Sequence, residues 1–229
     1  MIAFAEIEEA ALARHGREEI DRRLSSPRSA AELRALPDDR YLSAMSQRIF
    51  RAGLKHELVD RKWPAFEEVF HGFAPDACAR LYDEDMEAVL EDKRLIRHLG
   101  KLRSVRANAQ AMRAIAEAEG SFGGWIANWP TDDIVGLWQA LQKRFQQMGG
   151  NSAPVFLRMV GKDTFIPTEH VVGALAHWGC EGGGTSRAER SALQSTFNDW
   201  AAETGRPLCQ LSQILALSAG GEGHHAARR

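Results

Sequence analysis

Helical periodicity, punctuated by capping residues, is the feature that most constrains what this chain can fold into. Ser29 precedes Glu32 by three residues, and Ser186 precedes Glu189 by the same interval. This spacing is typical of a capping box, in which each side chain accepts a hydrogen bond from the other residue's backbone N–H at a helix start. No segment alternates apolar and polar residues in the manner of a half-buried strand. The sequence therefore predicts an all-α fold.

Apolar periodicity, prolines and glycines give the positions of the expected helices. Gly53 is expected to end the helix of residues 38–50, and Pro64 to occupy the first turn of the next one. The expected helical ranges are 38–50, 64–70, a segment opening at 75, 92–119 as one long helix or two nearly collinear ones, 132–145, 186–204 and 208–217.

Length and composition indicate an ordinary globular protein. The 229 residues, 44% of them hydrophobic, can form one compact domain or two lobes sharing a cleft. We expect residues 1–219 to form a single helical domain and residues 220–229 to be a disordered tail. The net charge of −2 gives no global basic signature, so any contact with nucleic acid must come from a local patch.

The cysteines and the apolar runs indicate where the protein works. Cys78, Cys180 and Cys209 lie far apart and form no paired framework, which favours a reducing compartment. No apolar run approaches the ~20 residues that a membrane-spanning helix needs. The first residues are charged and contain no signal-peptide core. We therefore expect a cytoplasmic protein, monomeric and without a membrane partner.

A local basic run lies between Lys93 and Arg113, with no acidic residue in it. Its members are Lys93, Arg94, Arg97, Lys101, Arg103, Arg106 and Arg113. On a helix, Lys93, Arg97 and Lys101 would share one face, and such a face attracts phosphate. The alternative interpretation is a solvated helix face paired with the acidic residues of 83–92.

A second candidate site is the turn between two helical patterns at residues 143–153. Gly149 and Gly150 permit a sharp turn and a close approach of the backbone to another surface. The helix that follows begins near Asn151 and Ser152, and its first N–H groups can bind an anion. The sequence predicts a helix–turn–helix hairpin here.

Several blocks together resemble one family. The Arg-Ala-Gly-Leu at 51–54, the Trp-Pro-Ala-Phe at 63–66, the Phe-His-Gly-Phe at 70–73 and the Ile-Arg-x-x-x-Lys-Leu at 96–102 are similar to blocks of the DNA-3-methyladenine glycosylase I family. The alignment needs no gap from Ala52 to Phe70, and the resemblance extends from about Tyr41 to Leu175. It implies a helix-hairpin-helix DNA glycosylase fold, with helical lobes around a central cleft.

The resemblance also implies roles for individual residues. In the superfamily the hairpin holds a DNA phosphate, which here implicates Gly149, Gly150, Asn151 and Ser152. Superfamily enzymes carry a catalytic aspartate at a similar distance after the hairpin. Here Glu169 lies 19 residues after Gly150 (169 − 150). Glu169 is therefore the expected catalytic carboxylate.

Two further comparisons with the superfamily complete the expected chemistry. Asp163 is the competing carboxylate, and a plain helix-start role is the alternative for Glu169. Ser152 occupies the position of the lyase lysine of bifunctional relatives, so we expect monofunctional hydrolysis.

The chain departs from the family at its pocket. The ungapped alignment places Arg48 at the position of the family's glutamate and His56 at that of a pocket tryptophan. With Phe50 and Trp63, these residues are expected to lie near the extruded base. DNA contact is expected through Arg97 and Lys101 as well as through the hairpin.

The family's structural zinc has no matching ligand set here. The family binds it through an N-terminal Cys and His and a C-terminal His and Cys. Only His170 matches, Ala174 stands where the next ligand would lie, and no cysteine precedes Cys78. Because zinc needs at least three good ligands, we expect no metal and no cofactor.

The resemblance, together with the basic run and the glycine turn, implies a glycosylase that removes alkylated purines such as 3-methyladenine from double-stranded DNA in base-excision repair. A non-catalytic DNA-binding module that recognises damaged or distorted DNA is the alternative. A purely structural helical protein is a third interpretation, and it would make the basic run and the glycine turn coincidental.

Overall fold

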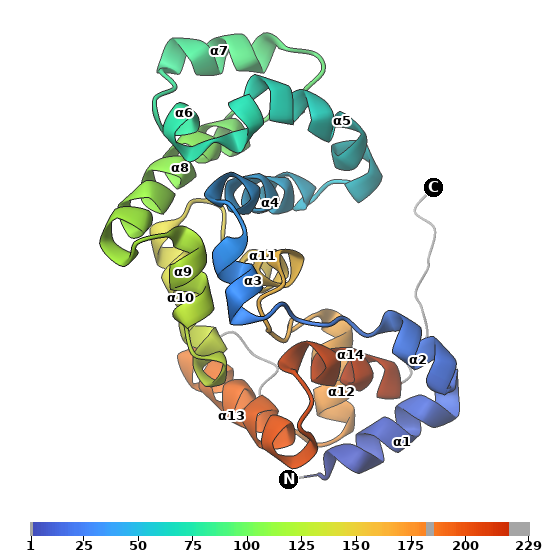
Figure 1. Ribbon diagram of the computed structural model, residues 1–229. Helices are drawn as coiled ribbons and strands as arrows, with labels where there is room; N and C mark the ends of the chain where they lie inside the picture. The colour runs from blue at the N-terminus through green and yellow to red at the C-terminus, as the bar shows by residue number, and fades with distance from the viewer. Residues whose placement is uncertain (1, 182–185, 220–229) are drawn as a thin grey trace. The chain divides into compact units, whose positions relative to one another are not determined.

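The computed structural model describes residues 2–181 and 186–219, and every regular element in these ranges is a helix (Figure 1). The all-α prediction is confirmed. The chain divides into two compact units. The terminal unit comprises residues 1–27, 131–135 and 163–229, and the central unit comprises 28–130 and 136–162. The expected tail, 220–229, lies outside the described residues.

The central unit holds most of the segments singled out by the sequence. Its elements are α3 (Ala30–Ala35), α4 (Asp38–Arg51), α5 (His56–Val69), η1 (His71–Phe73), α6 (Pro75–Ala79), α7 (Asp83–Glu91), α8 (Leu99–Glu119), α9 (Phe122–Asn128), most of α10 (Ile134–Arg144) and α11 (Ser152–Val160). Helix α8 packs against α4, α6, α7 and α9, and α11 packs against α4. These contacts make α4 and α8 the framework on which the candidate site residues of this unit stand.

The terminal unit is built around the last helix. Its elements are α1 (Phe4–His15), α2 (Arg17–Arg23), η2 (Thr131–Asp133), α12 (Glu169–His177), α13 (Arg187–Thr204) and α14 (Leu208–Ser218). Helix α14 packs against α1, α12 and α13. Phe165 and Phe197 stack with ring centroids 4.2 Å apart, and Phe197 and Trp200 are both fully buried. The expected apolar face of 186–204 is therefore the face that forms this core.

Most of the predicted helix caps are confirmed, but the expected cap of the helix of residues 38–50 at Asp38 or Asp39 was wrong, because Pro37 precedes α4 at that position. Both capping boxes are present, at Ser29 with Glu32 and at Ser186 with Glu189. Gly205 ends α13 with a φ of 69°, a left-handed conformation that glycine adopts without a steric penalty. Pro75 opens α6 in its first turn. Local sequence was thus sufficient for these caps, although it did not indicate the local cap of α8 at His98.

The prediction for Pro64 was wrong. Helix α5 begins at His56, so Pro64 lies in its interior and not in its first turn. Val59, Trp63 and Phe66 recur at helical spacing on both sides of the proline, and all three are buried. Burial of this face offsets the backbone hydrogen bond that proline cannot donate.

The helix expected at 92–119 begins only at Leu99. Residues 92–98 contain no helix, and the Asp92 carboxylate accepts the backbone N–H of Arg94 at 2.8 Å. Such a local bond offers the backbone an alternative to the helix. Lys93 and Arg97 therefore do not share a helix face with Lys101, which corrects that expectation.

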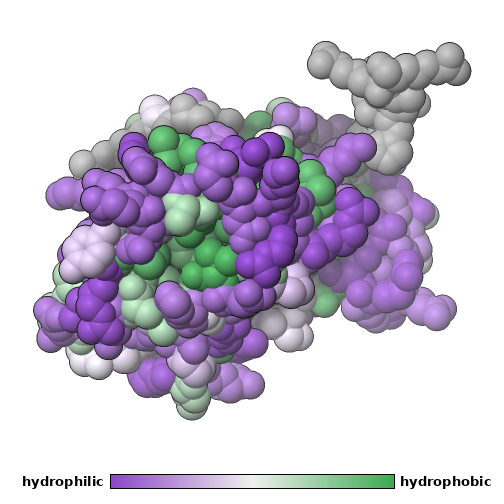
Figure 2. Space-filling model, turned by 90° about the horizontal axis from the view of Figure 1, so that it is seen from above, coloured by the Kyte–Doolittle hydropathy of each residue, from purple (hydrophilic) through white to green (hydrophobic). Residues whose placement is uncertain are grey.

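One surface of the central unit is seen from the α7 end in Figure 2, where hydrophilic side chains surround a hydrophobic area near the middle of the view. Leu54, Tyr82 and Leu99 are the large apolar side chains that are exposed among the described residues. Leu54 stands in the turn after α4, and Leu99 opens α8. No helix in the described ranges is both long and apolar enough to cross a membrane.

The buried hydroxyl of Tyr41 makes the central unit less stable as the pH becomes alkaline. This fully buried hydroxyl donates to the Leu33 carbonyl at 2.8 Å, and burial raises the pKa of Tyr41 to about 12. An unfolded tyrosine titrates near pH ~10, so this stabilisation is complete below pH ~10 and is lost as the pH rises through ~12. We expect the free energy of unfolding to fall by about 2–3 kcal/mol over that window.

Urea unfolding at a series of pH values tests this expectation. The Tyr41→Phe variant lacks the titrating hydroxyl, so its curve should fall less steeply than that of the wild type. The fully buried Cys78 also has a raised pKa, of about 12, and contributes equally in both proteins. Parallel curves for wild type and variant would contradict the assignment to Tyr41.

Candidate functional site

The predicted hairpin is present between α10 and α11. Residues 145–151 form the turn, in which Gln147 and Gly150 have φ values of 63° and 56°. Gly149 and Gly150 are exposed, and a side chain added at either would meet nothing within 4 Å. Ser152 is buried, and its N–H bonds the Gly149 carbonyl at 3.1 Å. The turn therefore presents bare backbone to its surroundings.

Asn108 on α8 fixes the hairpin from behind. This fully buried side chain donates to the Gln146 carbonyl at 3.2 Å and accepts the Gln146 N–H at 2.7 Å. The Gln142 side chain donates to the Gly150 carbonyl at 3.3 Å. No local pattern in the sequence indicates this role of Asn108, because its partner lies 38 residues away.

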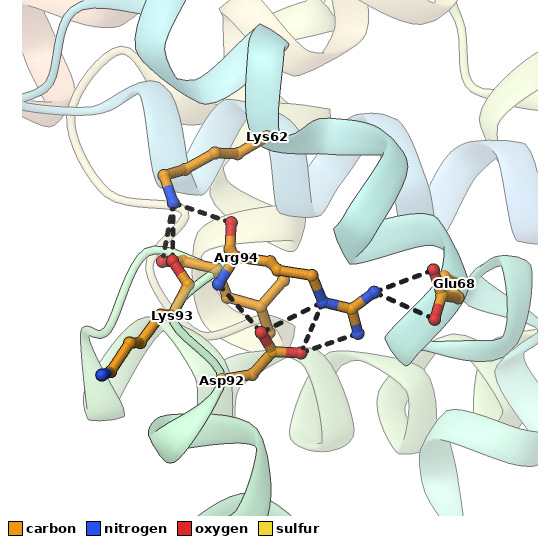
Figure 3. Close-up of polar contacts among 6 residues, drawn as sticks. Lys62, Glu68, Asp92, Lys93 and Arg94 are labelled. Carbon is orange, nitrogen blue, oxygen red and sulfur yellow. Dashed lines mark hydrogen bonds and ion pairs between the residues drawn. The ribbon is translucent and has the colours of Figure 1, made fainter.

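The segment of residues 92–98, here called the arm, is fastened to α5 at two points (Figure 3). The Lys62 ammonium donates to the carbonyls of Lys93, Arg94 and Leu95 at 3.0, 2.8 and 3.3 Å. The Arg94 guanidinium joins Asp92 of the arm to Glu68 of α5. These bonds lower the pKa of the Asp92 carboxyl, mainly through Arg94.

In the basic run, some residues are paired with acidic side chains and others are exposed without an ion pair in the described chain. The two interpretations, a DNA-binding face and a solvated paired face, therefore each apply to a part of the run. Arg94, Arg106 and Arg113 form ion pairs with acidic side chains: Asp92 and Glu68, Asp83, and Asp76 and Glu117, respectively. Lys93, Arg97 and Arg103 are exposed and make no ion pair within the described part of the chain. Lys93, Arg97 and Arg103 are therefore the residues of the run that can contact an external anion.

Lys101 occupies a different environment from the one expected for a DNA contact. Its side chain is 9% exposed, and its ammonium donates to the carbonyls of Ala52 at 2.6 Å and of Phe50 at 3.4 Å. These carbonyls belong to the end of α4, so Lys101 serves as a C-terminal cap. Burial, with a smaller contribution from Arg48, lowers the pKa of Lys101.

Arg48 on α4 has a partly buried charge. Its Nε is buried and has no hydrogen-bond partner among the described residues. Burial, and to a lesser degree Arg51, lowers the pKa of Arg48. Arg51 itself pairs with Asp60 at 2.6 Å. The residue at the position of the family's glutamate is thus a half-buried cation that forms no ion pair within the described residues.

The expected aromatic pocket residues lie together, but inside the core. Phe50 is fully buried and packs on Phe66 with centroids 4.6 Å apart, while Trp63 stacks on Phe66 at 5.0 Å. The Trp63 indole N–H donates to the Ser43 hydroxyl at 3.1 Å. His56, by contrast, is exposed as the first residue of α5. In this arrangement Phe50 of α4 and Trp63 of α5 form part of the core between these two helices.

The two candidate carboxylates of the terminal unit have different environments. Asp163 accepts the backbone N–H groups of Leu208 and Cys209, each at 2.9 Å, and so caps α14. Glu169 is the exposed first residue of α12, whose cap is the Thr168 hydroxyl. No hydrogen bond or ion pair within the described ranges occupies the Glu169 carboxylate. Of the two, Glu169 is the one free to act on a ligand.

The residues present do not fit the family's zinc site. His170 is exposed and Ala174 is buried. The Cys78 thiol is buried against the Phe70 carbonyl, and the Cys209 thiol lies near the Ser25 carbonyl. In the described ranges no three His, Cys, Asp or Glu side chains come together as possible metal ligands.

Elemental analysis of the purified protein is expected to find less than stoichiometric zinc, because fewer than three ligand positions are filled. The measurement should follow extensive dialysis, so that loosely held metal is removed. One zinc per chain after dialysis would contradict this prediction and would direct the search to Cys180 and nearby histidines.

Comparison with known proteins identifies the class and then the family. The solved structure of 3-methyladenine DNA glycosylase I from Staphylococcus aureus superposes with a TM-score of 0.51 at 20% identity, over 67% of this chain and 92% of that one. The fold is therefore that of a helical DNA glycosylase. The methyladenine glycosylase family model matches residues 34–151, more than half of the sequence, and the chain belongs to this family.

Two curated relatives agree with this assignment. A DNA-3-methyladenine glycosylase of Haemophilus influenzae is 33% identical over 76 residues, which cover 33% of this chain and 41% of the relative. DNA-3-methyladenine glycosylase 1 of Escherichia coli is 26% identical over 148 residues, covering 56% of this chain and 77% of the relative. The chain thus spans less than half of the first relative and about three quarters of the second.

Proposed function

We propose that this protein is a monofunctional DNA glycosylase that hydrolyses the N-glycosidic bond of alkylated purines such as 3-methyladenine. Membership of the methyladenine glycosylase family over residues 34–151 is the observation that carries the proposal. The matched range includes α4, the arm and the hairpin turn, which are the segments with candidate roles in DNA contact. The protein would act in base-excision repair, as a cytoplasmic monomer on double-stranded DNA.

The hairpin and the arm supply the contacts to the DNA backbone. The exposed turn at Gly149 and Gly150 lets a phosphate approach the main chain at the start of α11. Arg97 adds a point charge from the arm. Lys101 contributes indirectly, because its ammonium holds the end of α4.

The chemistry requires that the damaged nucleotide leave the stack and that its glycosidic bond break through an oxocarbenium-like state. A positively charged base such as 3-methyladenine is already a good leaving group, so acid catalysis contributes little. A preorganised carboxylate stabilises the developing positive charge on the sugar. We assign this role to Glu169, since Asp163 is committed to capping α14.

The experiment is to incubate the protein with duplex DNA treated with a methylating agent and to separate the released bases by chromatography. The proposal predicts free methylpurine and an intact sugar–phosphate backbone with an abasic site. Strand cleavage by the protein itself would contradict the monofunctional assignment. DNA binding without any released base would favour the alternative, a non-catalytic module that recognises damaged DNA.

A further inference from the structure

The arm has no secondary structure of its own, and one side chain compensates for this. Backbone carbonyls outside a helix or sheet need donors from elsewhere. An ammonium group has three N–H donors, and Lys62 directs its ammonium to three successive carbonyls, those of residues 93, 94 and 95. All of its donors are therefore used within the protein. Lys62 shapes the arm and has no donor left for another ligand.

A second fastening fixes the beginning of the arm. The Arg94 guanidinium gives Nε and Nη2 to Asp92 and Nη1 to both oxygens of Glu68, at distances from 2.8 to 3.2 Å. Two carboxylates neutralise this cation. The Arg94 side chain therefore serves to join the arm to α5 (Figure 3).

The side chains of the fastened arm differ sharply in exposure. Leu95 is 3% exposed and anchors the middle of the arm in the core. Lys93 and Arg97, two residues to either side, are exposed and make no ion pair within the described residues. In Figure 3 the Lys93 ammonium extends away from the labelled groups. The arm thus buries Leu95 and presents two cations that have no ion pair within the described residues.

We propose that the arm is a preset clamp for the DNA backbone, in which Lys93 and Arg97 contact phosphates while Lys62 and Glu68 act as positioning residues that hold the arm in shape. This inference rests on the proposed function, because it takes duplex DNA as the ligand. It differs from a general basic patch in one respect: an acidic residue, Glu68, strengthens binding because it holds the arm in place. A preset clamp loses less conformational entropy on binding than a free segment would.

A charge-matched pair of variants tests the role of Lys62. Lys62→Met and Arg61→Met each remove one positive charge from neighbouring positions of α5, and Arg61 is exposed with no ion pair in the described chain. Anisotropy with a fluorescent duplex should show about tenfold weaker binding for Lys62→Met than for Arg61→Met. The plot of log affinity against log salt should also become less steep. Its slope should shrink by up to about 2, because both phosphate contacts depend on the arm. Equal affinities and slopes for the two variants would overturn the proposal.

Glu68→Gln distinguishes the clamp from a general basic patch, because the two predict opposite changes in DNA affinity. Removing a negative charge from a basic patch should strengthen DNA binding if only the net field matters. If Glu68 positions the arm through Arg94, binding should instead weaken, by roughly two- to threefold, as expected for an exposed ion pair. Glu57→Gln is the control on the same helix, since Glu57 is exposed and unpaired in the described chain, and it should bind slightly more tightly.

The outcome separates this inference from the proposed function. Glu68 is a surface residue with 68% of its side chain exposed, so Glu68→Gln should leave the fold intact, which circular dichroism can verify. If the wild type binds DNA and releases methylpurine but Glu68→Gln binds more tightly, the clamp is wrong and the glycosylase assignment stands. A wild type that does not bind duplex DNA would overturn both.

Discussion

Glu169→Gln is expected to slow the release of methylated purine by about 10²–10³-fold while leaving DNA affinity almost unchanged. The substitution keeps the shape of the side chain and removes the charge that would face the oxocarbenium-like sugar. Glu169 is exposed and unpaired within the described residues, so no structural bond is lost. The cost to α12 is limited to the interaction of a carboxylate with a helix start, about 0.3–1 kcal/mol.

Asp163→Asn is the matched control. Asp163 also lies near the start of α12, but its two oxygens accept backbone N–H groups at the beginning of α14. Asparagine keeps only one accepting oxygen, so this variant should unfold more readily and yet release bases at the wild-type rate while folded. Single-turnover kinetics on methylated DNA, with thermal unfolding alongside, distinguish the two variants. Wild-type release by Glu169→Gln would mean that another group stabilises the transition state.

The sequence was sufficient for features that depend on neighbouring residues. The capping boxes at Ser29 and Ser186, the end of α13 at Gly205 and the hairpin around Gly150 all follow from local spacing. The family blocks added the fold, which periodicity alone could not specify. Long-range side-chain bonds to the backbone could not be predicted, because no local pattern encodes them.

Several of the missed features depend on such long-range bonds. Lys62 bonds carbonyls 31–33 residues away, and it thereby helps to hold residues 92–98 outside the helix that was expected to begin there. Lys101 reaches the end of α4, 49 residues away, which removes it from the expected surface. Asp163 caps a helix 45 residues later in the sequence. In each case a charged residue that sequence analysis assigned to a ligand, or left unassigned, satisfies the protein's own backbone.

Arg48→Met is expected to raise the free energy of unfolding by about 1–3 kcal/mol, which is the usual cost of a buried donor without a partner. The buried Nε of Arg48 has no acceptor among the described residues, and its charge lies near Arg51 and Lys101. Methionine fills similar volume without a charge. Urea denaturation at neutral pH measures the difference.

Arg51→Met is the control for this substitution on the same helix. Arg51 donates to Asp60 at 2.6 and 2.9 Å, so its removal breaks an existing ion pair and should give no comparable gain in stability. If Arg48→Met proved less stable than the wild type, the Arg48 guanidinium would have to be satisfied in the folded protein. If Arg48→Met is more stable but releases bases more slowly, Arg48 is a residue retained for the substrate at the expense of the fold. A gain in stability without loss of activity would show that the cation has no part in the reaction, and that the position of the family's glutamate is dispensable in this chain.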